Sequence, residues 1–186
     1  AVTALTAQNT TGGHGIHAAP LDFVERQIEV VVTDIAPDAV KTGMLANAET
    51  VRRVASAIEK HGLKNVVVDT VMSAKGGASL LEAEALGALR TELVPKARVI
   101  TPNVPEAAAL LGLGEEEFQA GNMDARAREL GKLGCEWVLL KGGHVRDDEE
   151  RSVDYLYHAA SGEMRTYASE RIATANTHGT GCTFAS

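Results

Sequence analysis

Apolar and polar positions along this chain follow two alternating patterns, one typical of buried strands and one typical of amphipathic helices. Short strand-like runs predict strands at 1–6, 39–42, 65–69, 98–101 and 137–141, since brief apolar stretches bounded by turn signals favour buried strands. Apolar residues at helical spacing predict helices at 20–34, 47–62, 82–93, 105–111 and 122–133. Two runs around Ser161 and Gly162 predict an antiparallel pair of strands.

This order of elements predicts the fold class. Strands that alternate with helices are typical of an α/β protein with a doubly wound, mostly parallel sheet, and the last two runs add an antiparallel edge. The chain has 186 residues, of which 45% are hydrophobic. That is enough to bury one substantial core, so we expect a single domain over 1–186.

Charge and composition exclude several classes of function. The net charge is −7 and aromatic residues make up 4% of the chain, which disfavours a nucleic-acid partner. Cys135 and Cys182 lie far apart without the spacing of a zinc site or a disulfide framework, so we expect a reducing, cytoplasmic environment. No apolar run approaches the roughly 20 residues that a membrane span needs, so we expect no membrane partner.

The unusual residues fall at the ends of the predicted strands. They lie in the loops "TGM" (42–44), "DTVM" (69–72), "TPNVPE" (101–106), "KGGH" (141–144) and "HGTGC" (178–182). The carboxyl ends of parallel strands meet along one edge of an open sheet, and ligands bind at that edge. The alternative is that these are ordinary turns rich in glycine and proline.

These loops carry the groups that phosphoryl transfer requires. Lys141 at a strand end can supply a cation for the transferring group. Asn103 and Glu106, three residues apart, can hold hydrated magnesium, or they can cap the start of a helix; both interpretations can be true together. Asp69 ends an apolar strand, so its carboxylate needs a partner, and we expect a metal-bound water or an amide.

The glycine-rich run from Gly179 to Cys182 predicts a second anion-binding element. A Gly-Thr-Gly turn that leads into a helix points backbone amides outward, toward an anion. Cys182 then lies in the first turn, where the helix dipole favours a thiolate. The alternative is that Cys182 is a small buried hydrophobic residue.

Other motifs are weaker. "GHGIHA" (13–18) matches G-x-G-x-x-A, and Asp34 lies at a suitable distance for a ribose-binding acid. A polar break separates this motif from the preceding strand, so the tight turn of a dinucleotide site is missing. No P-loop motif occurs, and the histidines lack the H-x-x-x-H spacing of a zinc enzyme.

Several blocks together resemble a known family. They are "TALTAQNT", "KTGML", "VVVDTVM", "ITPNVPEAAALLG", "VLLKGGH" and "NTHGTGCTFAS". In this order they are similar to the hydroxymethylpyrimidine and hydroxymethylpyrimidine-phosphate kinases of thiamine biosynthesis, in the ribokinase-like superfamily. The resemblance runs from Ala1 to Ser186. It implies a ribokinase-like three-layer fold and phosphorylation, with ATP and Mg²⁺, of 4-amino-5-hydroxymethyl-2-methylpyrimidine and then of its monophosphate.

The same resemblance implies roles for the candidate residues. Those expected to line the pyrimidine pocket are Gln8, Met44 and Val71, with Gln8 at the polar edge of the ring. Lys141 is expected to contact the transferring phosphate, while Asp69, Asn103 and Glu106 belong to the ATP and metal region, with Glu106 holding the metal through water. The residues expected to form the anion hole are Gly179, Thr180, Gly181 and Cys182.

Some features depart from the family pattern. The opening strand, the "GGAGIQAD"-type segment and the closing helices have no counterpart here, so we expect this chain to be an internal part of a longer protein. A pyridoxal kinase on the same scaffold stays an alternative, although "AQNT" around Gln8 favours the pyrimidine enzyme. A non-catalytic pyrimidine sensor is a second alternative, disfavoured because Lys141 and Cys182 are both present. We expect a homodimer that acts on small molecules.

Overall fold

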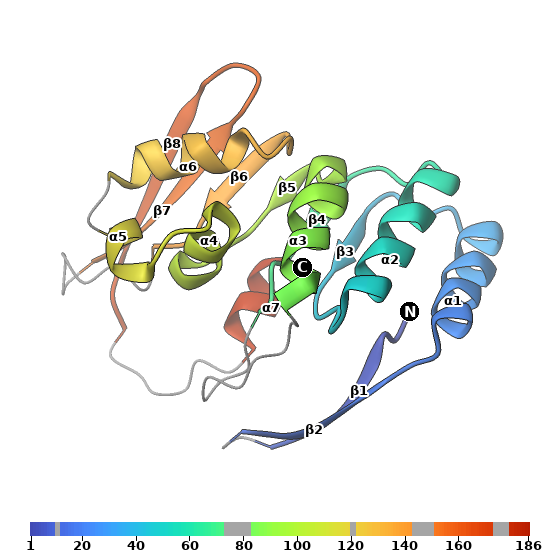
Figure 1. The fold of residues 1–186 in the computed structure, drawn as a ribbon. Helices are drawn as coiled ribbons and strands as arrows, with labels where there is room; N and C mark the ends of the chain where they lie inside the picture. Colours follow the sequence, from blue (N-terminus) through green and yellow to red (C-terminus); the bar gives the residue numbers. More distant parts are fainter. Residues whose placement is uncertain (10–11, 73–82, 120–121, 143–150, 173–178) are drawn as a thin grey trace.

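A mixed sheet of six strands forms the centre of the structure (Figure 1). The computed structural model describes residues 1–9, 12–72, 83–119, 122–142, 151–172 and 179–186. The strands, in spatial order, are β3 (Val40–Thr42), β4 (Val66–Val68), β5 (Val99–Ile100), β6 (Trp137–Leu140), β7 (Arg151–His158) and β8 (Met164–Glu170). Strands β3 to β6 are parallel, and β7 and β8 are antiparallel. The predicted parallel sheet with an antiparallel edge is confirmed.

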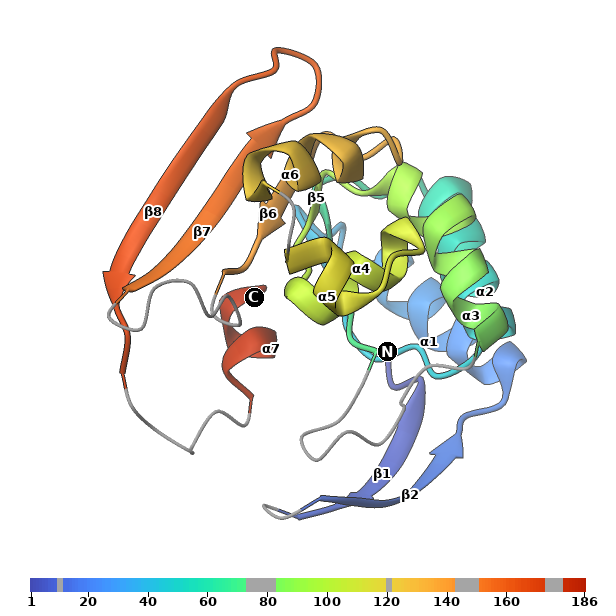
Figure 2. The ribbon, with the colours of Figure 1, turned by 60° about the vertical axis from the view of Figure 1, so that its left-hand side comes forward.

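The helices follow from this strand order. They are α1 (Leu21–Asp34), α2 (Ala48–Lys60), α3 (Ala83–Ala88), α4 (Val104–Leu111), α5 (Glu115–Gln119), α6 (Met123–Gly131) and α7 (Thr180–Phe184). Each parallel strand pairs with the next one along the chain, and right-handed crossovers between such strands place the connecting helices on the same face. Figures 1 and 2 show α2, α3, α4 and α6 along that face.

Apolar side chains from the strands and these helices form the core. Val68, Ile100 and Leu140 of the sheet are fully buried against helix residues such as Val51 and Leu110. Helix α2 shows how the sequence sets the boundaries of an element. The Asn47 side chain accepts a hydrogen bond from the Thr50 amide at 2.9 Å and caps the first turn.

The predicted helix at 82–93 is replaced by three shorter elements. Glu82 lies outside the described residues; α3 is followed by a π-helical turn, η1 (Leu89–Leu93), and by a 3₁₀ turn, η2 (Val94–Lys96). Pro95 provides the physical reason, because it has no amide hydrogen to donate and its ring clashes with the preceding turn. The helical turns therefore continue to Lys96, three residues beyond the predicted end, and β5 begins at Val99.

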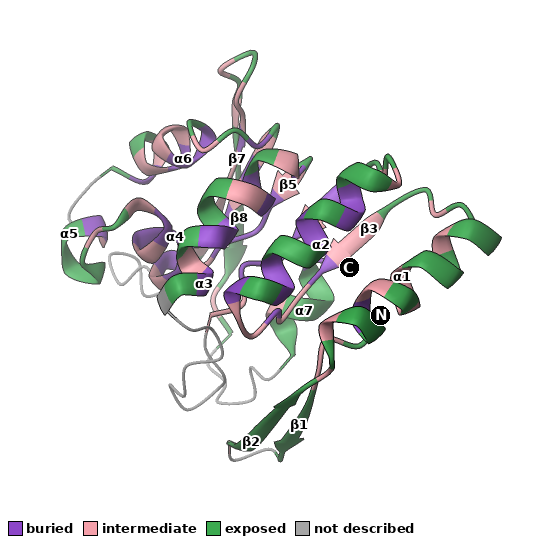
Figure 3. Cartoon of the chain, turned by 45° about the vertical axis from the view of Figure 1, so that its right-hand side comes forward, coloured by how far each residue is buried: buried purple, intermediate pink, exposed green. Residues whose placement is uncertain are grey.

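A separate antiparallel hairpin extends from the main body (Figures 1 and 3). It consists of β1 (Ala4–Gln8) and β2 (Gly13–Ala18), and most of its residues are exposed. The strand predicted at 1–6 thus overlaps β1, whereas β2 was not predicted. Because 13–18 is a strand and the next helix begins at Leu21, these residues do not form the turn of a dinucleotide site.

None of the helices within the described ranges combines the length and the apolar character that a membrane crossing requires.

Candidate functional site

A cavity of about 1260 Å³ opens at the carboxyl ends of β3 to β6. Every residue that the sequence predicted for the site lines this cavity: Gln8, Met44, Asp69, Val71, Asn103, Glu106, Lys141, Gly179, Thr180, Gly181 and Cys182. The predicted convergence of five loops at one sheet edge is therefore confirmed for the parts of the loops that the structure describes. The segments 73–82, 143–150 and 173–178, which include Gly143, His144 and His178, lie outside those parts.

The pairing of β5 and β6 continues into the site. Asn103 and Lys141 form a parallel bridge just beyond the two strands, and the Lys141 amide donates to the Pro102 carbonyl at 2.9 Å. This bridge holds the two residues side by side at the sheet edge. The position of Lys141 is thus set by the backbone of the sheet, and its side chain is 16% exposed.

Asp69 is the buried centre of the site, with 3% of its surface exposed. Lys41 Nζ lies 3.3 Å from its Oδ2 and Lys141 Nζ lies 3.8 Å from its Oδ1. The Thr101 hydroxyl donates to Oδ1 at 3.5 Å. We expected a metal-bound water or an amide as its partner; among the described residues, two ammonium groups and a hydroxyl face this carboxylate. Burial of this carboxylate is offset by two cations.

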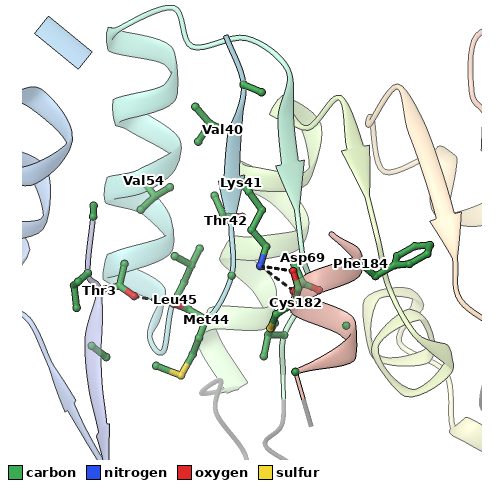
Figure 4. A pocket seen from close by; sticks show the side chains of 18 of the residues that line it. Thr3, Val40, Lys41, Thr42, Met44, Leu45, Val54, Asp69, Cys182 and Phe184 are labelled. Atoms are coloured by element: carbon green, nitrogen blue, oxygen red, sulfur yellow. Dashed lines mark hydrogen bonds and ion pairs between the residues drawn. The ribbon is translucent and has the colours of Figure 1, made fainter. Parts of the chain in front are cut away.

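Lys41 is the functional candidate that the sequence analysis missed. It lies within β3, and its Nζ donates to the Cys182 carbonyl at 3.5 Å as well as facing Asp69 (Figure 4). The block "KTGML" contains it, but only residues that follow the strand were predicted to belong to the site. A lysine near the carboxyl end of a buried parallel strand was an available signal, since such strands are otherwise apolar.

Asn103 and Glu106 cap the start of a helix, which was one of the two roles predicted for them. Asn103 Oδ1 accepts from the Glu106 amide, and Glu106 Oε2 accepts from the Asn103 amide, both at 2.9 Å, at the beginning of α4. The buried Thr70 hydroxyl donates to the same Oε2 at 2.9 Å. Burial raises the pKa of the Glu106 carboxyl, against the opposing effects of the Asn103 amide and the Lys141 ammonium.

Metal ligation by protein groups alone has little support here. Within the described ranges, no three histidine, cysteine, aspartate or glutamate side chains gather as a metal-binding group. Asp69 faces two lysines, whereas Glu106 keeps its Oε1 without a hydrogen bond from another described residue. Glu106 is thus the carboxylate best placed to reach a hydrated ion that also contacts phosphate oxygens.

Helix α7 carries the glycine-rich turn to the cavity. Gly179 has a φ of +78° and precedes the first helical residue, a conformation that favours glycine. Cys182 is exposed at the cavity, so it is not the buried hydrophobic residue of the alternative interpretation. Desolvation, followed by the Asp69 carboxylate, raises the pKa of its thiol. The helix dipole was expected to favour a thiolate, and these two contributions act in the opposite direction.

Cys135 provides the contrast within the same chain. Its side chain is 2% exposed in the core, and burial raises the pKa of its thiol to about 11. It is a structural residue with no route to the cavity chemistry.

Gly142 follows Lys141 and packs against β7. Its amide donates to Asp154 Oδ1 at 2.9 Å, and Asp154 belongs to β7. A Cβ atom at Gly142 would lie 1.8 Å from the Val153 carbonyl oxygen. Only glycine therefore permits this approach of the two backbones, which sets the position of the neighbouring lysine.

The three residues predicted for a pyrimidine pocket lie on the β1 and β3 side of the cavity or beside Asp69. Gln8 ends β1, Met44 follows β3, and Val71 follows Asp69. The Thr3 hydroxyl donates to the Met44 carbonyl at 2.8 Å and ties the hairpin to this loop (Figure 4). The part of the cavity next to β1 and β3 is named the acceptor side, and the part next to β5, β6 and Asp154 the donor side, for the roles proposed for them.

Comparison with known proteins gives a consistent result. The family model described as phosphomethylpyrimidine kinase matches residues 1–186. The hydroxymethylpyrimidine/phosphomethylpyrimidine kinase of Bacillus subtilis is 45% identical over 188 aligned positions, which cover 100% of this chain and 66% of the relative.

Solved structures agree with this match. A phosphomethylpyrimidine kinase from Clostridium difficile superposes with a TM-score of 0.76 at 36% identity, covering 89% of this chain and 69% of that one. A pyridoxal kinase from Staphylococcus aureus, in complex with AMP-PCP, superposes with a TM-score of 0.82 at 32% identity, covering 99% and 65%. The chain thus spans about two thirds of the length of these relatives.

Proposed function

This chain belongs to the phosphomethylpyrimidine kinase family, and we propose that the protein carrying it phosphorylates 4-amino-5-hydroxymethyl-2-methylpyrimidine and then the resulting monophosphate. In each step an acceptor oxygen forms a bond to the γ-phosphorus of ATP, and ADP leaves. The fold is that of ribokinase-like kinases, as the superposed structures indicate.

The observation that carries the proposal is the arrangement around Asp69. Lys41 and Lys141 reach this carboxylate within one cavity, together with the turn that precedes α7. Phosphoryl transfer needs little covalent help and depends on cations that neutralise the transferring group. Lys141, on the donor side, is the group we assign to that phosphate.

ATP as the phosphoryl donor is supported by the relatives. The Staphylococcus aureus pyridoxal kinase binds AMP-PCP, and its structure superposes on 99% of this chain. Mg²⁺ would be held on the donor side by Glu106 Oε1, by water and by phosphate oxygens, since this ion usually keeps several waters. When bound, it would neutralise charge that develops on the phosphate oxygens.

We assign to Cys182 the role of accepting the proton that the acceptor alcohol loses. An alcohol must lose a proton as its oxygen attacks, and a thiolate close to the acceptor can accept it. A monophosphate already carries an ionised oxygen, so its phosphorylation needs no base. A protonated Cys182 then avoids the repulsion that a fixed carboxylate would exert on the incoming anion.

The first experiment compares substrates. We expect the protein carrying this chain to turn over hydroxymethylpyrimidine with a higher kcat/KM than pyridoxal, because Gln8 lies where it can read a polar ring edge. A coupled assay of ADP release with pyrimidine alcohol, its monophosphate and pyridoxal measures this ranking. A higher value for pyridoxal would favour the vitamin B6 alternative, and binding without turnover would favour the sensor.

The same protein offers a test of assembly. We propose a homodimer, and sedimentation analysis in the presence and absence of substrate measures its oligomeric state.

The pH dependence of the first step tests Cys182. Because the pKa of this thiol is raised above the ordinary cysteine value, its basic form grows only at alkaline pH. We expect kcat/KM for the alcohol to rise with pH through that range, and Cys182→Ala to be slower and to lose the rise. The monophosphate step of the unmodified protein should lack this dependence.

The Cys182→Asp variant tests whether a fixed negative charge at position 182 affects the two steps differently. We expect it to retain more of the alcohol step than Cys182→Ala does and to damage the monophosphate step preferentially. If aspartate supports the second step as well as cysteine does, the charge argument is wrong. Cys135→Ala, in the core, is a control for loss of a thiol elsewhere, once thermal unfolding confirms its fold.

A further inference from the structure

Lys41 and Lys141 approach the same carboxylate from opposite sides. Lys41 belongs to β3, and Lys141 follows β6, which is the third strand beyond it in the sheet. Adjacent strands lie about 4.8 Å apart, so the two backbones are separated by roughly 14 Å. Asp69 at the end of β4 lies between them. The two ammonium groups therefore reach different oxygens of one carboxylate, each from its own strand.

Lys41 is only loosely held by its neighbours. Its Nζ lies 3.3 Å from Asp69 Oδ2, yet that buried oxygen receives no hydrogen bond of good geometry from the described residues. The Cys182 carbonyl, at 3.5 Å, is at the outer limit of hydrogen bonding. By comparison, Lys96 Nζ and Glu59 Oε2 lie 2.7 Å apart on the surface. An ammonium group has three donors, so Lys41 keeps donors available for a ligand.

The surroundings of Lys41 leave room for an anion. Gly43 has no side chain, and a Cβ atom there would lie 3.5 Å from Lys41 Nζ. Met44, which follows directly, lines the same cavity, and Figure 4 shows Lys41 reaching from β3 to the space between Asp69 and Cys182. The lysine is thus on the acceptor side, with 27% of its side chain exposed.

The charged groups around the cavity make Lys41 more important for the monophosphate acceptor than for the alcohol. A phosphate monoester carries about −1.5 to −2 charges at neutral pH. Asp69 and Glu106 would oppose it, and Lys141 is assigned to the phosphate that is transferred from ATP. The neutral alcohol carries no charge that a further cation would have to neutralise.

We propose that Lys41 binds the phosphate group of the monophosphate acceptor and thereby determines specificity in the second phosphorylation. The inference rests on the proposed function, since it names the group that recognises the second substrate of that function. Asp69 acts as a positioning residue, because it holds the ammonium group at the cavity until the anion arrives.

Lys41→Gln is the decisive variant. A hydrogen bond to a charged group contributes about 1.5–3 kcal/mol, so we expect KM for the monophosphate to rise roughly 10- to 100-fold. The KM for the alcohol should rise clearly less than the KM for the monophosphate, because the neutral alcohol has no anionic group for Lys41 to bind. Lys41→Arg keeps the charge and should restore most of the lost affinity, which a role in packing alone would not do. Lys64→Gln, at an exposed lysine, is the matched control.

Calorimetric titration of the monophosphate without ATP separates this inference from the proposed function. If the unmodified protein phosphorylates neither acceptor, the proposed function fails, and the titration still tests Lys41. Equal affinity of the unmodified protein and Lys41→Gln for the monophosphate overturns the inference. An equal rise in KM for both acceptors also overturns it, because Lys41 would then serve the site as a whole. Lys41→Met provides a second neutral variant if thermal unfolding shows that Lys41→Gln does not fold.

Discussion

Lys141→Ala should lower kcat for both acceptors by about 30- to 1000-fold while the fold stays intact. That range corresponds to about 2–4 kcal/mol, the usual loss when one electrostatic donor is removed from a reacting centre. The expected effect is large because Lys141 is mostly buried and is held beside Asn103 by the sheet. Steady-state kinetics with each acceptor measures it, and circular dichroism checks the fold.

Two comparisons make this result specific. Lys64→Ala removes an exposed lysine near the amino end of β4, away from the cavity at the carboxyl ends, and should leave kcat unchanged. Lys41→Gln should change mainly KM for the monophosphate. Substitutions at the two site lysines are therefore expected to affect different kinetic parameters. An unchanged kcat for Lys141→Ala in a folded protein would show that this lysine does not contact the transferring phosphate.

Gly142→Ala should be among the most destabilising single substitutions in the chain. The new Cβ atom would lie 1.8 Å from the Val153 carbonyl oxygen, a backbone atom that cannot turn away. Overpacking usually costs about 1–3 kcal/mol, and we expect the upper end or more. For a chain of this size, a loss of about 3 kcal/mol lowers Tm by roughly 6–12 °C.

Differential scanning calorimetry measures this loss. Gly87→Ala is the matched control, because a Cβ atom there would meet nothing within 4 Å and the residue lies in α3. Alanine is favoured over glycine in a helix, so this control should keep or raise Tm. A Tm for Gly142→Ala equal to that of the control would contradict the close approach of β6 and β7. Activity should fall together with Tm, since Lys141 is the adjacent residue.

Local patterns in the sequence were enough to predict the main sheet and its functional edge. The runs "NVVVD" and "WVLLK" predicted β4 and β6 because strands buried on both faces are nearly continuous in apolar residues. The rule that ligands bind at the carboxyl ends of such strands then brought Asp69, Asn103 and Lys141 together. These predictions depend on backbone geometry, which short sequence patterns specify.

The parts that could not be predicted depend on contacts between distant residues. Lys41 pairs with Asp69 and with the Cys182 carbonyl, 141 positions away, so nothing in its neighbourhood indicates its partner. The direction of the Cys182 pKa shift depends on burial and on Asp69, and the dipole argument considered only the helix itself. Strand β2 was missed because "GHGIHA" lacks the apolar alternation of a typical strand and is stabilised by pairing with β1.

The order of the strands has a consequence for how the protein forms during synthesis. Every pairing in the central sheet joins strands that are consecutive in the sequence, from β3 to β8. A nascent chain can therefore add each strand as it emerges. The contact between Lys41 and Cys182 closes a loop of 141 residues. At about 5–20 residues per second, the ribosome takes roughly 7–28 s to add them. Lys41 is therefore synthesised many seconds before α7, which completes the cavity.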